Sequence, residues 1–216
     1  MSPEFKFILA SGSPRRRELL TLLGLPFEVQ PGQINESINV AEKPLDYVKR
    51  MAEEKSNADI HSDNSWVLSA DTIVEHNGMV IGKPKDPAEA KETLKALRAK
   101  DHRVITALNF SIDGQSRSAQ CQTTVSMRDY SDDEINSYIF TNGPMDKAGA
   151  YAIQDAAFHP VSNLQGCWAN VMGLPLCHLH KLMRQSGLET EPGIAERCQS
   201  YLGIECPVFA EILNEA

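Results

Sequence analysis

The segment from Ser11 to Arg17 combines two hydroxyl groups, a glycine and three arginines directly after an apolar run. Ser13 suits a helix N-cap and the proline after it suits the first helical position, so the positive end of that helix would face the loop. With Ser11, such a loop offers hydroxyl and backbone N–H donors to an anion. Arg15 and Arg16 add charge and a donor geometry that suits phosphate. A capped surface helix with solvated arginines explains the pattern equally well.

A second pair of polar residues, Asp71 and Thr72, follows the apolar run over residues 66–70. We expect this run to be a strand with Asp71 at its end, where ligands of α/β sheets gather. A carboxylate in that position can bind a divalent cation or accept a proton from water. An ordinary strand-end aspartate bonded to a backbone turn is the competing interpretation.

A third segment, Gly82-Lys83-Pro84, resembles a phosphate-binding loop only in part. The spacing from Gly78 to Gly82 is one residue too short for that motif, and Pro84 stands where a Ser or Thr would bind Mg²⁺. A Walker-type mechanism is therefore excluded. Lys83 can still reach a phosphate as a point charge, although a solvated turn is an equal alternative.

Lys55 continues the apolar stripe of a helix that begins near Pro44. A lysine on an inward-facing stripe needs a partner, because burial of an unpaired charge is costly. Lys55 joins the cations above, and Glu36 and Asp71 add carboxylates that are candidate ligands of a metal cation. Lysines and arginines for phosphates, with carboxylates for a cation, fit a metal–polyphosphate substrate.

The elements that must position these residues follow an alternation of strands and helices, which predicts an α/β fold. Asn77-Gly78 indicates a hairpin, and the stretch from Gly149 to Ile153 is expected to be strand-like. Further strands are expected over residues 5–10, 27–30, 79–81, 102–112 and 117–128. Helices are expected to begin at or near residues 13, 44, 86, 131 and 175, the last of them running to residue 186.

Composition excludes some functional classes. The chain has 216 residues and a formal net charge of −8, which disfavours non-specific binding to nucleic acid. No apolar stretch approaches the roughly 20 residues of a membrane helix, and the N-terminus does not resemble a signal peptide. We therefore expect a cytoplasmic protein that binds neither nucleic acid nor membranes.

The five cysteines form an odd set without a Cys-x-x-Cys motif, as expected for reduced thiols in the cytosol. Cys177, His178 and His180 are close enough in sequence to be considered as metal ligands. They lie on an apolar helical pattern, however, so a packed helix with one more solvent-exposed face is favoured.

Taken together, the ordered motifs resemble the Maf family, and the resemblance covers roughly residues 5–186. Any one of these motifs is common, but their order makes the match specific. The matching segments are Ala10 to Leu20, Ala70 to Val74, Gly82 to Pro84 with His102 to Thr106, Asp146 to Gln154, and Asn170 to Leu176.

This resemblance implies a central mixed sheet flanked by helices, with two lobes and a deep cleft. It also implies a homodimer, a divalent cation such as Mg²⁺ or Mn²⁺, and attack of water on the α-phosphorus of a nucleoside triphosphate with release of pyrophosphate. In the family, the residue matched by Asp71 accepts the proton, and Glu36 matches an acidic cleft residue, so both are candidate metal ligands. Lys55 and Lys83 match the family's lysines.

Three positions resemble the family subgroup that acts on dTTP and UTP, namely Arg15, Thr72 and Gln154. The chain departs from the family at Ala152, where a glycine is usual, and over residues 155–165, which lack the common glycine-rich pattern. We expect a pyrophosphatase domain over residues 1–190 and an extension of unknown role over residues 191–216.

Two other functions remain open from the sequence. Because family members have been linked to septum formation, the chain could be a nucleotide-binding regulator of cell division in which hydrolysis is incidental. A phosphate-monoester hydrolase would instead release orthophosphate. Turnover and the identity of the phosphate product discriminate among the three.

Overall fold

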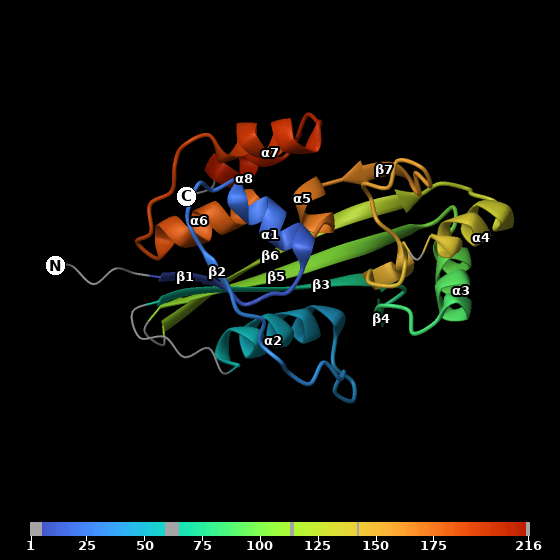
Figure 1. Ribbon diagram of the computed structural model, residues 1–216, viewed down its shortest axis with the longest axis horizontal. Helices are drawn as coiled ribbons and strands as arrows, with labels where there is room; N and C mark the ends of the chain where they lie inside the picture. The colour runs from blue at the N-terminus through green and yellow to red at the C-terminus, as the bar shows by residue number, and fades with distance from the viewer. Residues whose placement is uncertain (1–5, 59–64, 113–114, 142, 215–216) are drawn as a thin grey trace.

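A mixed seven-stranded sheet forms the centre of the molecule, with strand order β2-β1-β3-β5-β6-β7 and with β4 paired to β3 (Figure 1). The computed structural model describes residues 6–58, 65–112, 115–141 and 143–214. β1 runs parallel to both β2 and β3, whereas β3, β5, β6 and β7 pair antiparallel. The strands are β1 (Lys6–Leu9), β2 (Glu28–Val29), β3 (Ser65–His76), β4 (Met79–Ile81), β5 (Asp101–Ile112), β6 (Gln115–Met127) and β7 (Val161–Gln165).

Helices cover both faces of this sheet, so the expected α/β class with a helix-flanked mixed sheet is confirmed. Figure 1 shows α2 on one face and α1, α5 and α6 on the other, with α3 and α4 at the far end of the long strands. The helices are α1 (Pro14–Thr21), α2 (Pro44–Asn57), α3 (Pro87–Leu97), α4 (Asp132–Phe140), α5 (Trp168–Val171), α6 (Leu176–Gln185), α7 (Ile194–Leu202) and α8 (Phe209–Asn214), with a 3₁₀ turn η1 (Ala148–Ala150).

Coverage on both faces explains why β3 is buried almost throughout. Leu68 and Ala70 belong to the large core beneath α1 and α6, whereas Ile73 packs against α2 in a second core. Adjacent residues of β3, such as Val67 and Leu68, are therefore both buried although they face opposite sides of the sheet. The described helices include none that is long and apolar enough to cross a membrane.

The predicted end of this strand at residue 70 is wrong. β3 continues to His76, and Asp71 and Thr72 lie in its interior, opposite Ala107 and Thr106 of β5. On the other side, β1 ends at Leu9 beside Leu68. Because β1 stops while β3 continues, Asp71 and Thr72 lie beside the loop that follows β1 and not beside β1 itself. The cavity therefore lies at the carboxyl end of β1 and not at that of β3.

The strand expected from Gly149 to Ile153 is also absent. This stretch forms η1 and then a turn, because Gly149 and Ala150 both have a positive φ, of 72° and 59°. A side chain at Gly149 would meet Cγ2 of Val74 at 2.8 Å, so the close approach to β3 requires glycine.

Several local signals are confirmed. The Ser13 side chain accepts from the N–H of Arg16, and Ser131 forms a reciprocal capping box with Glu134. Asn77 and Gly78 both have a positive φ and connect β3 to β4 in the expected hairpin. The turn expected at residues 113–114 lies outside the described residues.

The extension beyond residue 190 packs on the domain through α7 and α8. Ile194 is buried against the main core. Arg197 Nε donates to the carbonyl of Leu22 at 2.6 Å, and Tyr201 Oη donates to the Glu18 carboxylate at 3.0 Å. The extension therefore contacts the C-terminal part of α1, whose N-terminus carries the first polar motif.

Candidate active site

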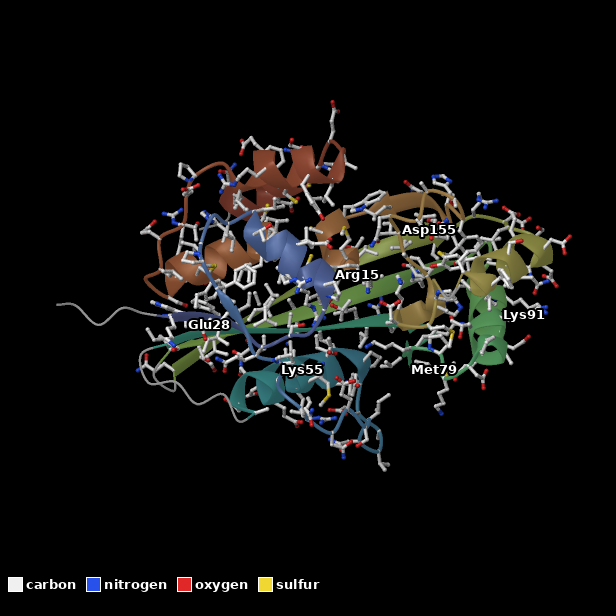
Figure 2. All side chains as sticks on the ribbon, in the orientation of Figure 1. Arg15, Glu28, Lys55, Met79, Lys91 and Asp155 are labelled. Atoms are coloured by element: carbon white, nitrogen blue, oxygen red, sulfur yellow. The ribbon has the colours of Figure 1, made fainter. Side chains whose placement is uncertain are left out.

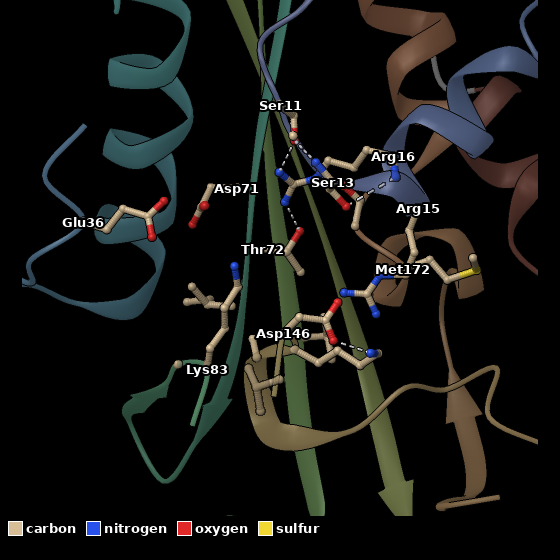
Figure 3. Close-up of a pocket in the computed structure, with 18 of the residues that line it drawn as sticks. Ser11, Ser13, Arg15, Arg16, Glu36, Asp71, Thr72, Lys83, Asp146 and Met172 are labelled. Carbon is tan, nitrogen blue, oxygen red and sulfur yellow. Dashed lines mark hydrogen bonds and ion pairs between the residues drawn. The ribbon is translucent and has the colours of Figure 1, made fainter. Parts of the chain in front are cut away.

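A cavity of about 830 Å³ opens beside β1, β3 and β4 (Figure 3). Its size lies in the range of about 300–1,000 Å³ that is usual for small-molecule sites. The predicted site residues come from segments far apart in the chain, and all ten line this one cavity. They are Ser11, Ser13, Arg15, Arg16, Glu36, Lys55, Asp71, Thr72, Lys83 and Gln154.

The charged residues of the cavity lie closer to the centre of the molecule than charged residues elsewhere on its surface do. Figure 2 shows Lys91 and Asp155 at the outside of the molecule, whereas Arg15 and Lys55 lie near its centre, close to the sheet. Positive groups therefore gather in one cavity of an otherwise acidic protein, which favours an anionic ligand at this point.

Arg16 donates hydrogen bonds to three separate segments of the cavity wall. Its Nη1 donates to Ser11 Oγ at 3.1 Å and to the carbonyl of Ala70 at 2.7 Å, and its Nη2 donates to Thr72 Oγ1 at 2.9 Å. Its Nε donates to the carbonyl of Gly173 at 2.9 Å. These contacts occupy most of the guanidinium donors, so they favour a positioning role. Its predicted role as a phosphate ligand stays a prediction.

Gly173 makes this close approach possible. It has a φ of 102°, and a side chain there would meet Arg16 Nε and Thr72 Oγ1, both at 3.2 Å. Burial lowers the pKa of the Arg16 guanidinium, although the charge of Asp71 acts in the opposite direction. An arginine remains charged despite such a shift, so Arg16 contributes a fixed positive charge behind the cavity.

Thr72 belongs to a hydrogen-bond chain that runs from the cavity into the core. Thr106 Oγ1 lies 3.0 Å from Thr72 Oγ1 and donates to the carbonyl of Asn170 at 3.1 Å. The hydrogen between the two hydroxyls therefore belongs to Thr72, which accepts from Arg16 and donates to Thr106. The Asn170 amide donates onward to the carbonyl of Val104 at 3.0 Å. Thr72 can offer a ligand only an acceptor.

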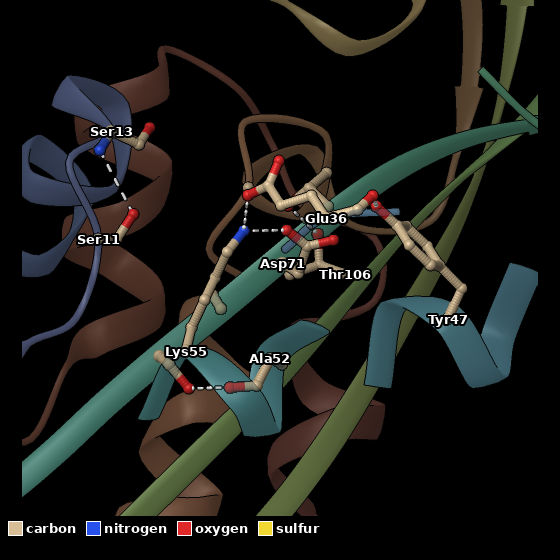
Figure 4. A network of polar contacts seen from close by, with 12 residues as sticks. Ser11, Ser13, Glu36, Tyr47, Ala52, Lys55, Asp71 and Thr106 are labelled. Carbon is tan, nitrogen blue, oxygen red and sulfur yellow. Dashed lines mark hydrogen bonds and ion pairs between the residues drawn. The ribbon is translucent and has the colours of Figure 1, made fainter. Parts of the chain in front are cut away.

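Lys55 has the partners that its position in the sequence requires, which confirms that prediction (Figure 4). Its Nζ lies 2.6 Å from Asp71 Oδ1 and 2.7 Å from Glu36 Oε1. Burial raises the pKa of Glu36, but the Lys55 hydrogen bond and nearby positive charges, including Lys83, outweigh it, so the pKa is lowered. Glu36 is therefore ionised near neutral pH.

Glu36 comes from a loop without regular structure, and α2 holds that loop in place. Tyr47 Oη donates to the carbonyl of Glu36 at 2.9 Å. Arg50 donates from Nη2 to the carbonyl of Ser37 at 3.0 Å and forms two 2.7 Å contacts with the Glu42 carboxylate. The hydrogen bond from Arg50 lowers the pKa of Glu42 to about 2. Contacts with α2 therefore hold the loop at Glu36 and at the residues that follow it.

Arg15 differs from Arg16 in that it points into the cavity, toward Asp146 (Figure 3). Asp146 forms an ion pair with Lys147, whose Nζ also donates to the carbonyl of Gly143 at 2.6 Å. Burial raises the pKa of Asp146, but the pairing with Lys147 and the charge of Arg15 lower it overall. Sequence reasoning missed Asp146 and Lys147 as site residues, although both begin one of the matching segments.

Gln154 has an exposed side chain at the end of a buried stretch. That stretch is fixed by the N–H of Ala152, which donates to Tyr138 Oη at 3.1 Å, and by a 2.8 Å contact between Tyr151 Oη and His102 Nε2. Burial lowers the pKa of His102 to about 4, so this histidine is neutral at neutral pH. The segment that carries Gln154 is therefore held by hydrogen bonds to Tyr138 and His102.

The carboxylates of Glu36 and Asp71 meet at one point, the Lys55 ammonium. Oxygen ligands suit Mg²⁺, which proteins commonly hold by one or two carboxylates together with substrate phosphates. Within the residues described, no group of three or more His, Cys, Asp or Glu is arranged to hold a metal. Glu36 and Asp71 by themselves fit as two oxygen ligands of a divalent cation.

The cavity at the end of β1, with its cationic wall and carboxylate pair, defines an α/β protein whose site suits a small anionic ligand. The model of the Maf-like protein family matches residues 6–186. The chain therefore belongs to the Maf-like family.

Two relatives similar in sequence agree with this assignment. A protein of Citrifermentans bemidjiense named dTTP/UTP pyrophosphatase is 43% identical over 185 residues, covering 83% of this chain and 95% of that protein. A Bacillus cytotoxicus protein of the same name is 41% identical over 181 residues, covering 83% and 95%. The Ham1 protein of Staphylococcus aureus shows a weak structural similarity, with a TM-score of 0.40 and 14% identity over 57% of this chain and 72% of that chain.

Proposed function

We propose that this protein is a nucleoside triphosphate pyrophosphatase that hydrolyses dTTP and UTP to the monophosphate and pyrophosphate. The observation that carries the proposal is the carboxylate pair of Asp71 and Glu36 in the same cavity as the Ser11–Arg16 loop and Lys83. The names of the relatives support the same reaction and the same substrates.

In this proposal the triphosphate lies against the loop that follows β1. The hydroxyls of Ser11 and Ser13 and the charges of Arg15 and Lys83 bind its phosphate oxygens. Arg16 holds the loop against β3, which keeps these donors in place before the substrate arrives. Preorganised donors stabilise the charge that develops on the phosphates without reorganisation during the reaction.

Asp71 accepts the proton of the attacking water through the carboxylate oxygen that Lys55 does not bind. The water oxygen forms a bond to the α-phosphorus, and the bond from that phosphorus to the bridging oxygen breaks. Pyrophosphate leaves with the bridging oxygen. Glu36 and Asp71 would hold Mg²⁺ or Mn²⁺, which supplies Lewis-acid stabilisation of phosphate charge when bound.

The products test this assignment directly. Incubation of the purified protein with UTP and Mg²⁺ or Mn²⁺ is expected to give UMP and pyrophosphate in equal amounts, and a chelator is expected to stop the reaction. Product identity is read by anion-exchange chromatography and a coupled pyrophosphate assay. Formation of UDP and orthophosphate would contradict attack at the α-phosphorus.

The same assay addresses the alternative of a cell-division regulator with incidental hydrolysis. Such a protein needs a nucleotide-binding cavity but no carboxylate placed to accept a proton, so the site favours the enzyme. The proposal includes a homodimer and a cytosolic location. Light scattering on the purified protein tests the first, and cell fractionation tests the second.

The hydroxyl of Tyr47 is expected to support substrate binding through Glu36. Tyr47→Phe keeps the buried ring but removes the 2.9 Å hydrogen bond to the Glu36 carbonyl. A single such bond corresponds to about a 2- to 10-fold change, here a rise in KM for the metal–UTP complex with kcat nearly unchanged. Steady-state kinetics at fixed Mn²⁺ determine KM and kcat separately.

Tyr201→Phe is the matched control, because it removes a hydroxyl that bonds Glu18 and does not line the cavity. It is expected to keep the parental KM. If Tyr47→Phe behaved like this control, the loop contact would have no part in substrate binding.

The five cysteines are expected to be dispensable for the reaction. Cys121, Cys167 and Cys177 are buried, Cys198 and Cys206 are half-buried, and none lines the cavity. Burial raises the pKa of both Cys177 and Cys198 to about 12, so neither is a reactive thiolate. Native treatment with iodoacetamide is therefore expected to leave most activity. Stoichiometric zinc bound at Cys177, His178 and His180 would contradict this expectation.

A further inference from the structure

Lys55 stands between the two carboxylates that the proposed function assigns to a cation. The distances from its Nζ to Asp71 Oδ1 and Glu36 Oε1 are 2.6 and 2.7 Å. The side chains of Lys55 and Asp71 are each only 13% exposed, whereas that of Glu36 is 58% exposed. A shielded ammonium with two charge-assisted hydrogen bonds is strongly held, and it uses carboxylate oxygens that a metal would also bind.

Charge balance explains why an ammonium is needed there. Without it, Asp71 and Glu36 would place two negative charges at one point, and mutual repulsion would favour protonation of one of them. Lys55 adds one positive charge to these two negative ones and leaves a net charge of −1. A divalent cation arriving alone must displace the ammonium from its hydrogen bonds or bind beside a positive charge. Either route weakens its binding.

A triphosphate removes this obstacle. Lys55 lines the same cavity as Ser11 and Ser13, so phosphate oxygens bound there offer the ammonium new partners. The lysine side chain carries a compact charge on a flexible four-carbon stem. The ammonium can therefore change partners without movement of α2. The phosphate oxygens also complete the ligand shell that two carboxylates leave open.

On the basis of the proposed function, we infer that Lys55 takes the place of the divalent cation in the free protein, and that the cation binds tightly only together with a triphosphate. Lys55 thereby couples the two ligands. Because coupling between two ligands is reciprocal, the triphosphate raises the affinity for metal by the same factor as the metal raises the affinity for triphosphate.

Direct binding of Mn²⁺ tests this coupling without catalysis. Free Mn²⁺ is counted by electron paramagnetic resonance in titrations of the protein, alone and with α,β-methylene-UTP, which has no cleavable α,β-bridging oxygen. The parent protein is expected to bind Mn²⁺ weakly alone and at least about tenfold more tightly with the analogue. Lys55→Met is expected to bind Mn²⁺ alone about tenfold more tightly than the parent does, and to lose most of the enhancement by the analogue.

Lys83→Met is the matched control, because it removes the same charge from the same cavity without a contact to either carboxylate. It is expected to change the affinity for Mn²⁺ alone far less than Lys55→Met does. Lys55→Gln provides a second neutral variant, and thermal unfolding verifies that each variant is folded.

Two results would overturn the inference while leaving the proposed reaction intact. One is a Lys55→Met protein that binds Mn²⁺ alone no more tightly than the parent, and the other is an equal effect of Lys83→Met. Failure of the parent protein to bind Mn²⁺ even with the analogue would instead contradict the proposed metal–triphosphate site, and the inference with it.

Discussion

Replacement of Asp71 by asparagine is expected to lower kcat for UTP hydrolysis by about 10²–10⁴-fold, because the amide cannot accept the proton of water. Asp71 is nearly buried and lies next to Thr72, which Arg16 holds. The variant tests the chemistry of one atom, since asparagine keeps the size of the side chain and an oxygen that can accept from Lys55.

The fold is expected to survive this change. Asp71 lies in the interior of β3, where its backbone pairs with Ala107, and that ladder does not depend on the carboxylate. The measurement is kcat under saturating metal and UTP, with thermal unfolding recorded on the same preparation. Asp132→Asn is the control, because Asp132 is an exposed aspartate whose ion pair with Arg98 lies outside the cavity. Parental turnover in Asp71→Asn would show that Asp71 is only structural.

Replacement of Gln154 by leucine is expected to remove the preference for pyrimidine triphosphates. A uracil or thymine edge presents two carbonyls and one N–H, and a single amide can meet it with one donor and one acceptor. A bidentate amide contact of this kind corresponds to about a 10- to 100-fold difference in discrimination between bases. We therefore expect the ratio of kcat/KM for UTP to that for dGTP to fall by this factor in Gln154→Leu.

The best rate is expected to fall less than the preference, because the proposal assigns Gln154 to the base, whereas Ser11 binds the phosphates and Asp71 accepts the proton. Gln122→Leu is the control, since Gln122 is exposed on β6 and does not line the cavity. CTP is a useful further substrate, because a rotated amide could pair with its edge as well. The assignment of Gln154 to base reading fails if the parent turns over dGTP as well as UTP, or if the ranking is unchanged in Gln154→Leu.

The structure also accounts for one departure from the family. At position 152 alanine stands where glycine is usual, and the segment tolerates it because the positive φ falls at Gly149 and Ala150. The Ala152 N–H still donates to Tyr138 Oη, and the residue is buried. The support of Gln154 therefore does not depend on a glycine at this position.

The sequence by itself determined the features that depend on neighbours a few residues away. Helix starts at Ser13, Asp86 and Ser131 follow from caps that close within one turn, and the Asn77-Gly78 turn follows from its tolerance of positive φ. The α/β class follows from the alternation of apolar runs. The types of residue in the candidate site were also evident, because cations and carboxylates are informative in an acidic chain.

Only the tertiary structure decided how those residues meet. Arg16 bonds the carbonyl of Gly173, 157 residues away, and Lys55 joins a loop to the interior of β3. The place of Asp71 within β3 depends on the helices that cover both faces of the sheet and on the early end of β1, neither of which a local pattern contains. Such contacts depend on strand register and packing between distant segments, because the free energy that fixes them comes from burial of the whole sheet.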